Sequence, residues 1–207
     1  MTERLRIHGR AIAGVEAVAF DAFGTLIDYP LKLHPYRRLL AQREAASAGR
    51  LDPVVRREIL TSSEPVEQLA QRYGLQAQVP AMLEELATEL AAVRLYPDVL
   101  DAIRCLRAAG LRVGVCSNLA QAYGPVVREL LGDHVDALVL SFEVGLVKPE
   151  VAMFETLSDQ IGVAPVATFF IGDSVTSDVE GAQGVGMTAR LIRREMGETL
   201  CDLLQVR

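Results

Sequence analysis

Five short apolar runs constrain the fold of this chain more than any other feature of its sequence. They cover residues 17–20, 111–116, 137–140, 167–171 and 189–192. Each is rich in Val, Ile, Leu or Phe and lacks the alternation of apolar and polar residues that a half-exposed strand shows. This pattern is typical of strands that are buried on both faces of a parallel sheet.

Helical patterns lie between these runs. Apolar residues recur at helical spacing and are followed by Gly110, Gly132 and Gly162, each of which can end a helix. The apolar positions are Val99, Ile103 and Leu106; Val127, Leu130 and Leu131; and Phe154, Leu157 and Ile161. Strands and helices in alternation predict an α/β fold, with a Rossmann-like open parallel sheet and right-handed crossovers.

The stretch from residue 29 to residue 96 differs from the rest. It contains no comparable strand-like run, but Met82, Leu86, Leu90 and Val93 repeat at helical spacing. We therefore expect a small helical domain over 29–96, inserted into an α/β domain that is formed by 1–28 and 97–207.

Composition narrows the classes of function. The 207 residues are 50% hydrophobic and 23% charged, as in soluble globular proteins, and 21 Lys and Arg against 27 Asp and Glu give a net charge of -6. This acidic balance argues against sequence-independent binding of nucleic acid. No run predicts a signal peptide or a membrane span, and the three cysteines lack metal-ligand spacing, so a cytoplasmic setting without membrane contact is expected.

Polar residues follow several of the predicted strands. Asp21 comes directly after the first run, Ser117 and Asn118 after the second, and Asp173 after the fourth, while Lys148 lies beyond the third. Ligands of open parallel sheets bind beyond the carboxyl ends of the strands, where we expect these side chains to meet. Two carboxylates, hydrogen-bond donors and one ammonium suit an anionic substrate.

The segments that hold these residues carry a family resemblance. FDAFGTLID, VCSN, LVKPEVAMF and FFIGDSVTSDVEGA resemble, in this order, the four motifs of the haloacid dehalogenase superfamily, most of whose members are phosphatases. The resemblance covers about residues 15–193. The helical insertion after the first motif resembles the small C1 cap of that family.

The resemblance implies a role for each matching polar residue. Asp21 matches the nucleophile that attacks phosphorus and forms an aspartyl phosphate. Ser117 matches a phosphate ligand, and Thr25 a hydroxyl that donates to the phosphate or to the nucleophile. Lys148 matches the cation that bridges the nucleophile and the transferring group. Asn118, next to Ser117, is expected to contact the substrate or to shape the loop.

The resemblance also implies a magnesium site. Asp173, Asp21 and the main-chain carbonyl of Phe23 match the groups that hold Mg²⁺, which prefers oxygen ligands. Asp178 is expected to orient this site from behind the ligands or through water, and it can equally cap the next helix.

One position departs from the family pattern. The phosphatases carry a second aspartate two residues after the nucleophile, which protonates the leaving oxygen, and here that position is Phe23. General acid–base help contributes about 10² to 10⁴ in rate, so phosphates with poor leaving groups should react slowly. Asp28 is a nearby substitute, but a solvated loop position is the favoured interpretation for it.

The departure keeps a second function open. The 2-haloacid dehalogenases of the family have tyrosine at the position of Phe23, and their halide leaving group needs no proton. Arginines of the insertion would then receive the halide or the carboxylate: Arg37, Arg38, Arg43 or Arg50.

The fourth motif favours the phosphatase. The resemblance implies that the 2-haloacid dehalogenases of the family need no metal and lack the metal-binding GDSxxxD arrangement. In this sequence Asp173 and Asp178 of that arrangement are both present. We therefore expect a Mg²⁺-dependent hydrolase of a small organic phosphate, as a monomer or homodimer, with a 2-haloacid dehalogenase as the alternative. A third interpretation is an inactive protein that binds a phosphorylated ligand or a protein.

Overall fold

A five-stranded parallel sheet forms the centre of the protein. The computed structural model describes residues 5–7, 10–39 and 53–206. The sheet has the strand order β7-β6-β3-β8-β9, and its strands span Ala17–Phe20 (β3), Arg112–Ser117 (β6), Ala137–Leu140 (β7), Thr168–Gly172 (β8) and Thr188–Leu191 (β9). All five predicted strands are confirmed within one or two residues.

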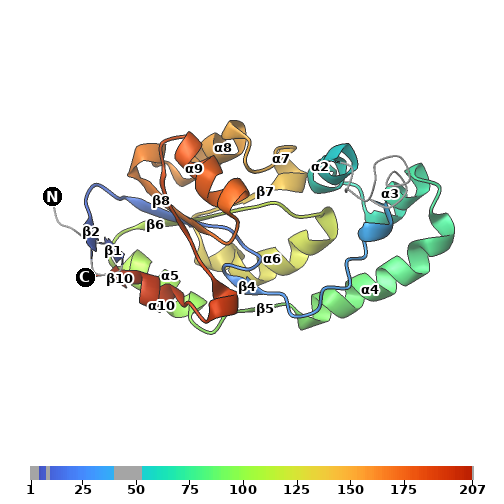
Figure 1. The fold of residues 1–207 in the computed structure, drawn as a ribbon, viewed down its shortest axis with the longest axis horizontal. Helices are drawn as coiled ribbons and strands as arrows, with labels where there is room; N and C mark the ends of the chain where they lie inside the picture. The colour runs from blue at the N-terminus through green and yellow to red at the C-terminus, as the bar shows by residue number, and fades with distance from the viewer. Residues whose placement is uncertain (1–4, 8–9, 40–52, 207) are drawn as a thin grey trace.

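Helices cover both faces of this sheet (Figure 1). Val18 and Phe20 of β3 pack into one buried cluster with α5 (Val99–Ala108) and α6 (Gly124–Leu131). The alternate residues Ala17 and Ala19 pack into a second cluster with α8 (Val151–Ile161). Because both faces are covered, the strand is apolar at every position. Four shorter helices are α7 (Ser141–Val144), α9 (Gly181–Gly184), α10 (Leu200–Leu203) and a π-helical turn at Val175–Glu180.

In the described part of the chain, three α-helices with both ends assigned lie between β4 (Ile27–Asp28) and β5 (Arg94–Leu95). They are α2 (Pro53–Thr61), α3 (Val66–Arg72) and α4 (Val79–Ala92), and they lie beyond one end of the sheet (Figure 1). β4 and β5 pair antiparallel, so the chain leaves the sheet and returns to it at one place.

These helices enclose a buried cluster of their own. Met82 and Leu86 of α4 are buried and Leu90 is partly buried, as the helical spacing predicts, and they meet Val55 and Leu69 of the preceding helices. That residues 29–96 form a separate cap domain with these bounds remains a prediction.

A second, antiparallel sheet joins the two ends of the described chain. Its order is β10-β1-β2, with strands at Leu5–Ile7 (β1), Arg10–Ile12 (β2) and Leu204–Val206 (β10). The sequence does not predict it, because three-residue strands carry too little pattern and β1 and β10 depend on a partner at the far end of the chain. None of the described helices has the length and apolar character that a membrane crossing requires.

Candidate active site

Asp21 lies at the carboxyl end of the central strand β3. Its backbone N–H donates to the carbonyl of Ile171 at 2.9 Å, which fixes the residue against β8. Its side chain is buried, and the Oδ1 atom accepts hydrogen bonds from Lys148 Nζ at 2.6 Å and from Ser117 Oγ at 3.1 Å. The structure therefore brings together three residues that are far apart in the sequence.

The Lys148 ammonium lies between two carboxylates. Its Nζ is 2.6 Å from Asp21 Oδ1 and 2.6 Å from Asp178 Oδ1, and the residue is only 4% exposed. Burial by itself would lower the pKa of Lys148, but Asp21 and Asp178 raise it above its usual value, so the side chain stays charged. Burial raises the pKa of Asp21 to about 6, against the opposing effect of Lys148.

Asn118 holds the main chain of Lys148. Its side-chain amide donates to the Lys148 carbonyl at 2.9 Å, and its Oδ1 accepts from the Lys148 N–H at 2.8 Å. Both polar atoms of this side chain thus help to fix the loop that carries the ammonium. Asn118 also lines a cavity beside the site, which leaves its predicted contact with a substrate open to test.

Three carboxylates gather where the metal site is predicted. One oxygen each of Asp21, Asp173 and Asp178 lie within 4.8 Å of one another. Asp173 is exposed, whereas Asp178 is buried and accepts the Ser174 N–H at 2.9 Å on its second oxygen. Oxygen donors in this arrangement fit a hard divalent cation such as Mg²⁺.

Two glycines allow the carboxylates to come this close to the main chain. A Cβ on Gly24 would overlap the Asp173 carboxylate, and one on Gly172 would overlap that of Asp178. Gly24 also has a φ of +78°, which other residues rarely adopt. The glycines of the first and fourth motifs are therefore required by close packing at this site.

Thr25 has a buried hydroxyl without a hydrogen-bond partner among the described residues. Its carbonyl accepts two hydrogen bonds from Arg194, at 2.9 Å from Nε and 2.8 Å from Nη2. Arg194 also pairs with Asp98 at 2.9 Å and stacks on the Tyr96 ring. The sequence gives no signal for Arg194, which joins the first-motif loop to the segment after β9.

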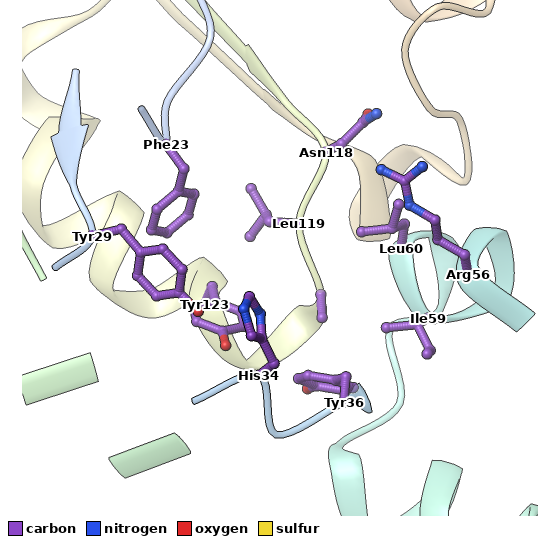
Figure 2. A pocket seen from close by; sticks show the side chains of 11 residues that line it. Phe23, Tyr29, His34, Tyr36, Arg56, Ile59, Leu60, Asn118, Leu119 and Tyr123 are labelled. Atoms are coloured by element: carbon purple, nitrogen blue, oxygen red, sulfur yellow. The ribbon is translucent and has the colours of Figure 1, made fainter. Parts of the chain in front are cut away.

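Phe23 lies where two cavities meet. Its ring packs edge to face against Tyr29 and Tyr123, with centroids 5.6 and 5.7 Å away. One cavity of about 440 Å³ is lined by Phe23 and by residues of α2 and of the loop after β6 (Figure 2). The other, of about 640 Å³, is lined by Phe23, Gly24 and Asp173 among others. Phe23 thus stands between an apolar cavity and the carboxylates.

Asp28, the substitute acid considered above, is paired with Arg94 across the β4–β5 pair at 2.5 Å. It lines the larger cavity together with Phe23 and Asp173. Its carboxylate is therefore already engaged by a cation.

The arginines proposed for a dehalogenase are placed in different surroundings. Arg38 makes a two-fold hydrogen-bonded ion pair with Glu85 of α4, and Arg37 is exposed. Arg43 and Arg50 lie outside the described residues. Arg56 of α2, which the sequence did not single out, lines the apolar cavity.

Glu89 of α4 is a third residue that the sequence analysis did not single out. It is fully buried and accepts hydrogen bonds from the Tyr123 hydroxyl at 2.5 Å and from the His34 N–H at 2.7 Å. Its position three residues after Leu86 places a carboxylate on the apolar face of the helix. A carboxylate among the apolar positions of a helix is the sequence signal by which Glu89 could have been found.

Comparison with known proteins decides the family. The family model of the haloacid dehalogenase-like hydrolases matches residues 15–186. The chain belongs to this family. Phosphatase MT3486 of Mycobacterium tuberculosis is 26% identical to this hydrolase over 197 residues, which cover 89% of this chain and 90% of that protein. The hydrolase spans about half the length of the archaeal glyceraldehyde 3-phosphate phosphatases that it also matches, with 32% identity over 109 residues for that of Methanopyrus kandleri.

Solved structures confirm the fold of the hydrolase. A haloacid dehalogenase-family phosphatase from Thermococcus onnurineus superposes with a TM-score of 0.59 at 25% identity, over 89% of each chain. A 2-haloacid dehalogenase from Pseudomonas syringae superposes with a TM-score of 0.60 at 21% identity, also over 89% of each chain. Since both kinds of enzyme share the fold equally, the choice between them depends on the site.

Proposed function

We propose that this hydrolase is a Mg²⁺-dependent phosphatase that acts on a small organic phosphate through an aspartyl phosphate on Asp21. The observation that carries the proposal is the convergence of Asp21, Asp173 and Asp178 within 4.8 Å, beside the buried ammonium of Lys148. A metal site has little use in halide displacement, whereas in phosphoryl transfer a metal ion offsets the charge of the phosphate.

The nucleophile is held by one of its two oxygens. Lys148 and Ser117 both donate to Oδ1 of Asp21, so Oδ2 has no hydrogen-bond partner among the described side chains. We assign the attack on phosphorus to Oδ2. Lys148 and the unpartnered hydroxyl of Thr25 would then donate to the oxygens of the transferring group as its charge redistributes, and the Ser117 hydroxyl would join them by turning from Asp21.

Asp21, Asp173 and the carbonyl of Phe23 are the groups that would hold Mg²⁺. When bound, the ion offsets the repulsion between an aspartate and a phosphate dianion. Asp178 has both oxygens engaged, with Lys148 and with the Ser174 N–H, so its proposed part is to orient the site. Asp173 is exposed and is the residue assigned to bind the ion directly.

The helices between β4 and β5 are proposed to act as a cap over this site. Polar contacts join α2 to the region after β7: Arg57 pairs with Glu150 at 2.9 Å and donates to the Gly145 carbonyl at 3.3 Å, and Ser141 donates to the Leu60 carbonyl at 2.6 Å. A cap that closes on the substrate keeps water away from the reacting groups and limits the entrance to small molecules.

The dehalogenase remains a second candidate because of Phe23, which cannot protonate a leaving group. Arg38, one of the arginines proposed to receive the halide, is already paired with Glu85. The intact carboxylate cluster is the stronger observation, and it favours the phosphatase.

A paired assay tests the proposal. The purified protein is given an activated aryl phosphate or a 2-haloacid, each with Mg²⁺ and with a chelator. Phosphate release that requires Mg²⁺ and is lost in Asp21→Asn supports the phosphatase. Halide release that is indifferent to the chelator identifies a dehalogenase, and inactivity of a folded protein towards both indicates a binding protein.

A further inference from the structure

The cavity on the apolar side of Phe23 is lined mainly by aromatic and aliphatic side chains. Figure 2 shows the Phe23 and Tyr29 rings on one side, Leu119 between, and Ile59 of α2 on the other side. Its volume of about 440 Å³ lies within the range of small-molecule sites, about 300–1,000 Å³. It is large enough for one or two rings of a ligand.

The aromatic wall is built edge to face. Phe23, Tyr29 and Tyr123 contact one another with centroids 5.6 to 6.4 Å apart and interplanar angles of 73° to 85°. The hydroxyl of Tyr123 already donates a hydrogen bond to the buried Glu89. This wall therefore offers ring faces and edges, which favour another aromatic ring by burial of apolar area and by quadrupole contacts.

The cavity is lined by near neighbours in sequence of the nucleophile and of Ser117. Phe23 is two residues from Asp21, and Asn118 and Leu119 directly follow Ser117, which donates to Asp21. Phe23 lines both this cavity and the one that Asp173 lines, so a phosphate bound among the carboxylates could direct its leaving group past Phe23 into this cavity. The side chain at the position where related phosphatases carry an acid is thus part of the cavity wall.

We propose that the substrate class of this phosphatase is an aryl phosphate monoester, whose ring occupies the cavity of Phe23, Tyr29, Tyr123 and Leu119. This inference rests on the proposed phosphatase function and extends it. Two independent features of Phe23 agree with it: its ring supplies the apolar wall, and its lack of a proton suits a phenolate, which is a far better leaving group than an alkoxide.

The reaction balances without an acid at this position. Oδ2 of Asp21 forms a bond to phosphorus as the bond from phosphorus to the aryl oxygen breaks, and the electron pair stays on that oxygen. The phenolate takes a proton from water and leaves hydroxide. A second water then splits the aspartyl phosphate, giving inorganic phosphate, the Asp21 carboxylate and a proton that neutralises the hydroxide, so the net consumption is one water for each phenol and phosphate formed.

Binding of two phosphonates tests the cavity independently of turnover. Phenylphosphonate and methylphosphonate differ only in the ring, and their dissociation constants are measured by calorimetry with Mg²⁺ present. We expect phenylphosphonate to bind at least about tenfold more tightly, from burial of the ring. In Phe23→Leu the ratio of the two dissociation constants should fall several-fold. In Arg104→Ala, which removes an exposed arginine on α5, this ratio should not change. Thermal unfolding verifies that both variants fold.

Hydrolysis of acetyl phosphate separates the two proposals, because its carboxylate leaving group needs neither a proton nor an aromatic pocket. Mg²⁺-dependent hydrolysis of acetyl phosphate that is lost in Asp21→Asn would support the phosphatase function. If the protein then bound the two phosphonates with equal affinity, the proposal of an aryl substrate would be wrong and the proposal of a phosphatase would stand. The aryl proposal expects phenyl phosphate to exceed glycerol 3-phosphate in kcat/KM by at least about a hundredfold. Equal values would overturn it.

Discussion

Lys148 Nζ lies 2.6 Å from Asp21 Oδ1, and the same nitrogen lies 2.6 Å from Asp178. One buried ammonium thus neutralises part of a cluster of carboxylates that would otherwise repel one another. The same arrangement that stabilises the folded site leaves a positive charge next to the proposed nucleophile. Stability and phosphate binding therefore depend on one side chain.

Removing this charge should destabilise the protein. Lys148→Met leaves Asp21 and Asp178 buried without their counter-ion, and we expect the free energy of unfolding to fall by about 3–5 kcal/mol in urea titrations with chelator. Lys32 is the only other lysine of the chain and is exposed, so Lys32→Met should change stability by less than about 0.5 kcal/mol. Equal stability of the two variants would contradict the structural role of Lys148.

Asp173 is assigned to bind the metal, and its neutral variant tests that assignment. Asp173→Asn keeps the size of the side chain but removes its charge, so we expect affinity for Mg²⁺, measured by calorimetry, to fall at least about tenfold. Asp133→Asn removes an exposed aspartate outside the cluster and should bind Mg²⁺ as the unchanged protein does. Unaltered binding in Asp173→Asn would exclude this residue as a ligand.

An acid at position 23 should restore activity towards poor leaving groups. Phe23→Asp is expected to raise kcat/KM for an alkyl phosphate, with an upper limit of about 10² to 10⁴. The Asn side chain of Phe23→Asn has nearly the same shape as the Asp side chain of Phe23→Asp but cannot exchange a proton, so this variant serves as the matched control. If both variants gain equally, the effect comes from space in the cavity and not from proton transfer.

Glu89 is expected to hold α4 against Tyr123 and the segment of His34. Glu89→Ala leaves the Tyr123 hydroxyl and the His34 N–H without their acceptor, which costs about 1–3 kcal/mol for each group that stays buried. Glu84→Ala, at an exposed position of the same helix, controls for the helix itself. Urea unfolding of the two variants should differ by at least about 1 kcal/mol, and similar midpoints would contradict this role.

Cys116 should resist alkylation in the folded protein. Burial raises the pKa of its thiol to about 12, so the reactive thiolate is nearly absent at pH 8. Iodoacetamide is therefore expected to label the exposed Cys105 and Cys201, and to reach Cys116 only after unfolding. Mass spectrometry of the peptides locates the label, and early modification of Cys116 would show that β6 opens to solvent.

The α/β fold could be predicted from the sequence because its signals are local. A strand such as β3 is buried on both faces and must be apolar throughout, and the residue after it, Asp21, is where the chain emerges from the sheet. The order of the polar residues along the chain was therefore enough to predict that they meet at one edge.

The tertiary structure alone decided which of these residues touch and which others join them. Arg194 reaches Thr25 from 169 positions away, and Glu89 of α4 meets Tyr123 just before α6. Such contacts leave no periodic pattern, because each depends on how two distant segments pack and not on the neighbours in the chain. The sequence by itself determined the strands, the crossovers and the set of candidate groups. Packing decided that Asn118 holds the Lys148 main chain and that Phe23 becomes the wall of an aromatic cavity.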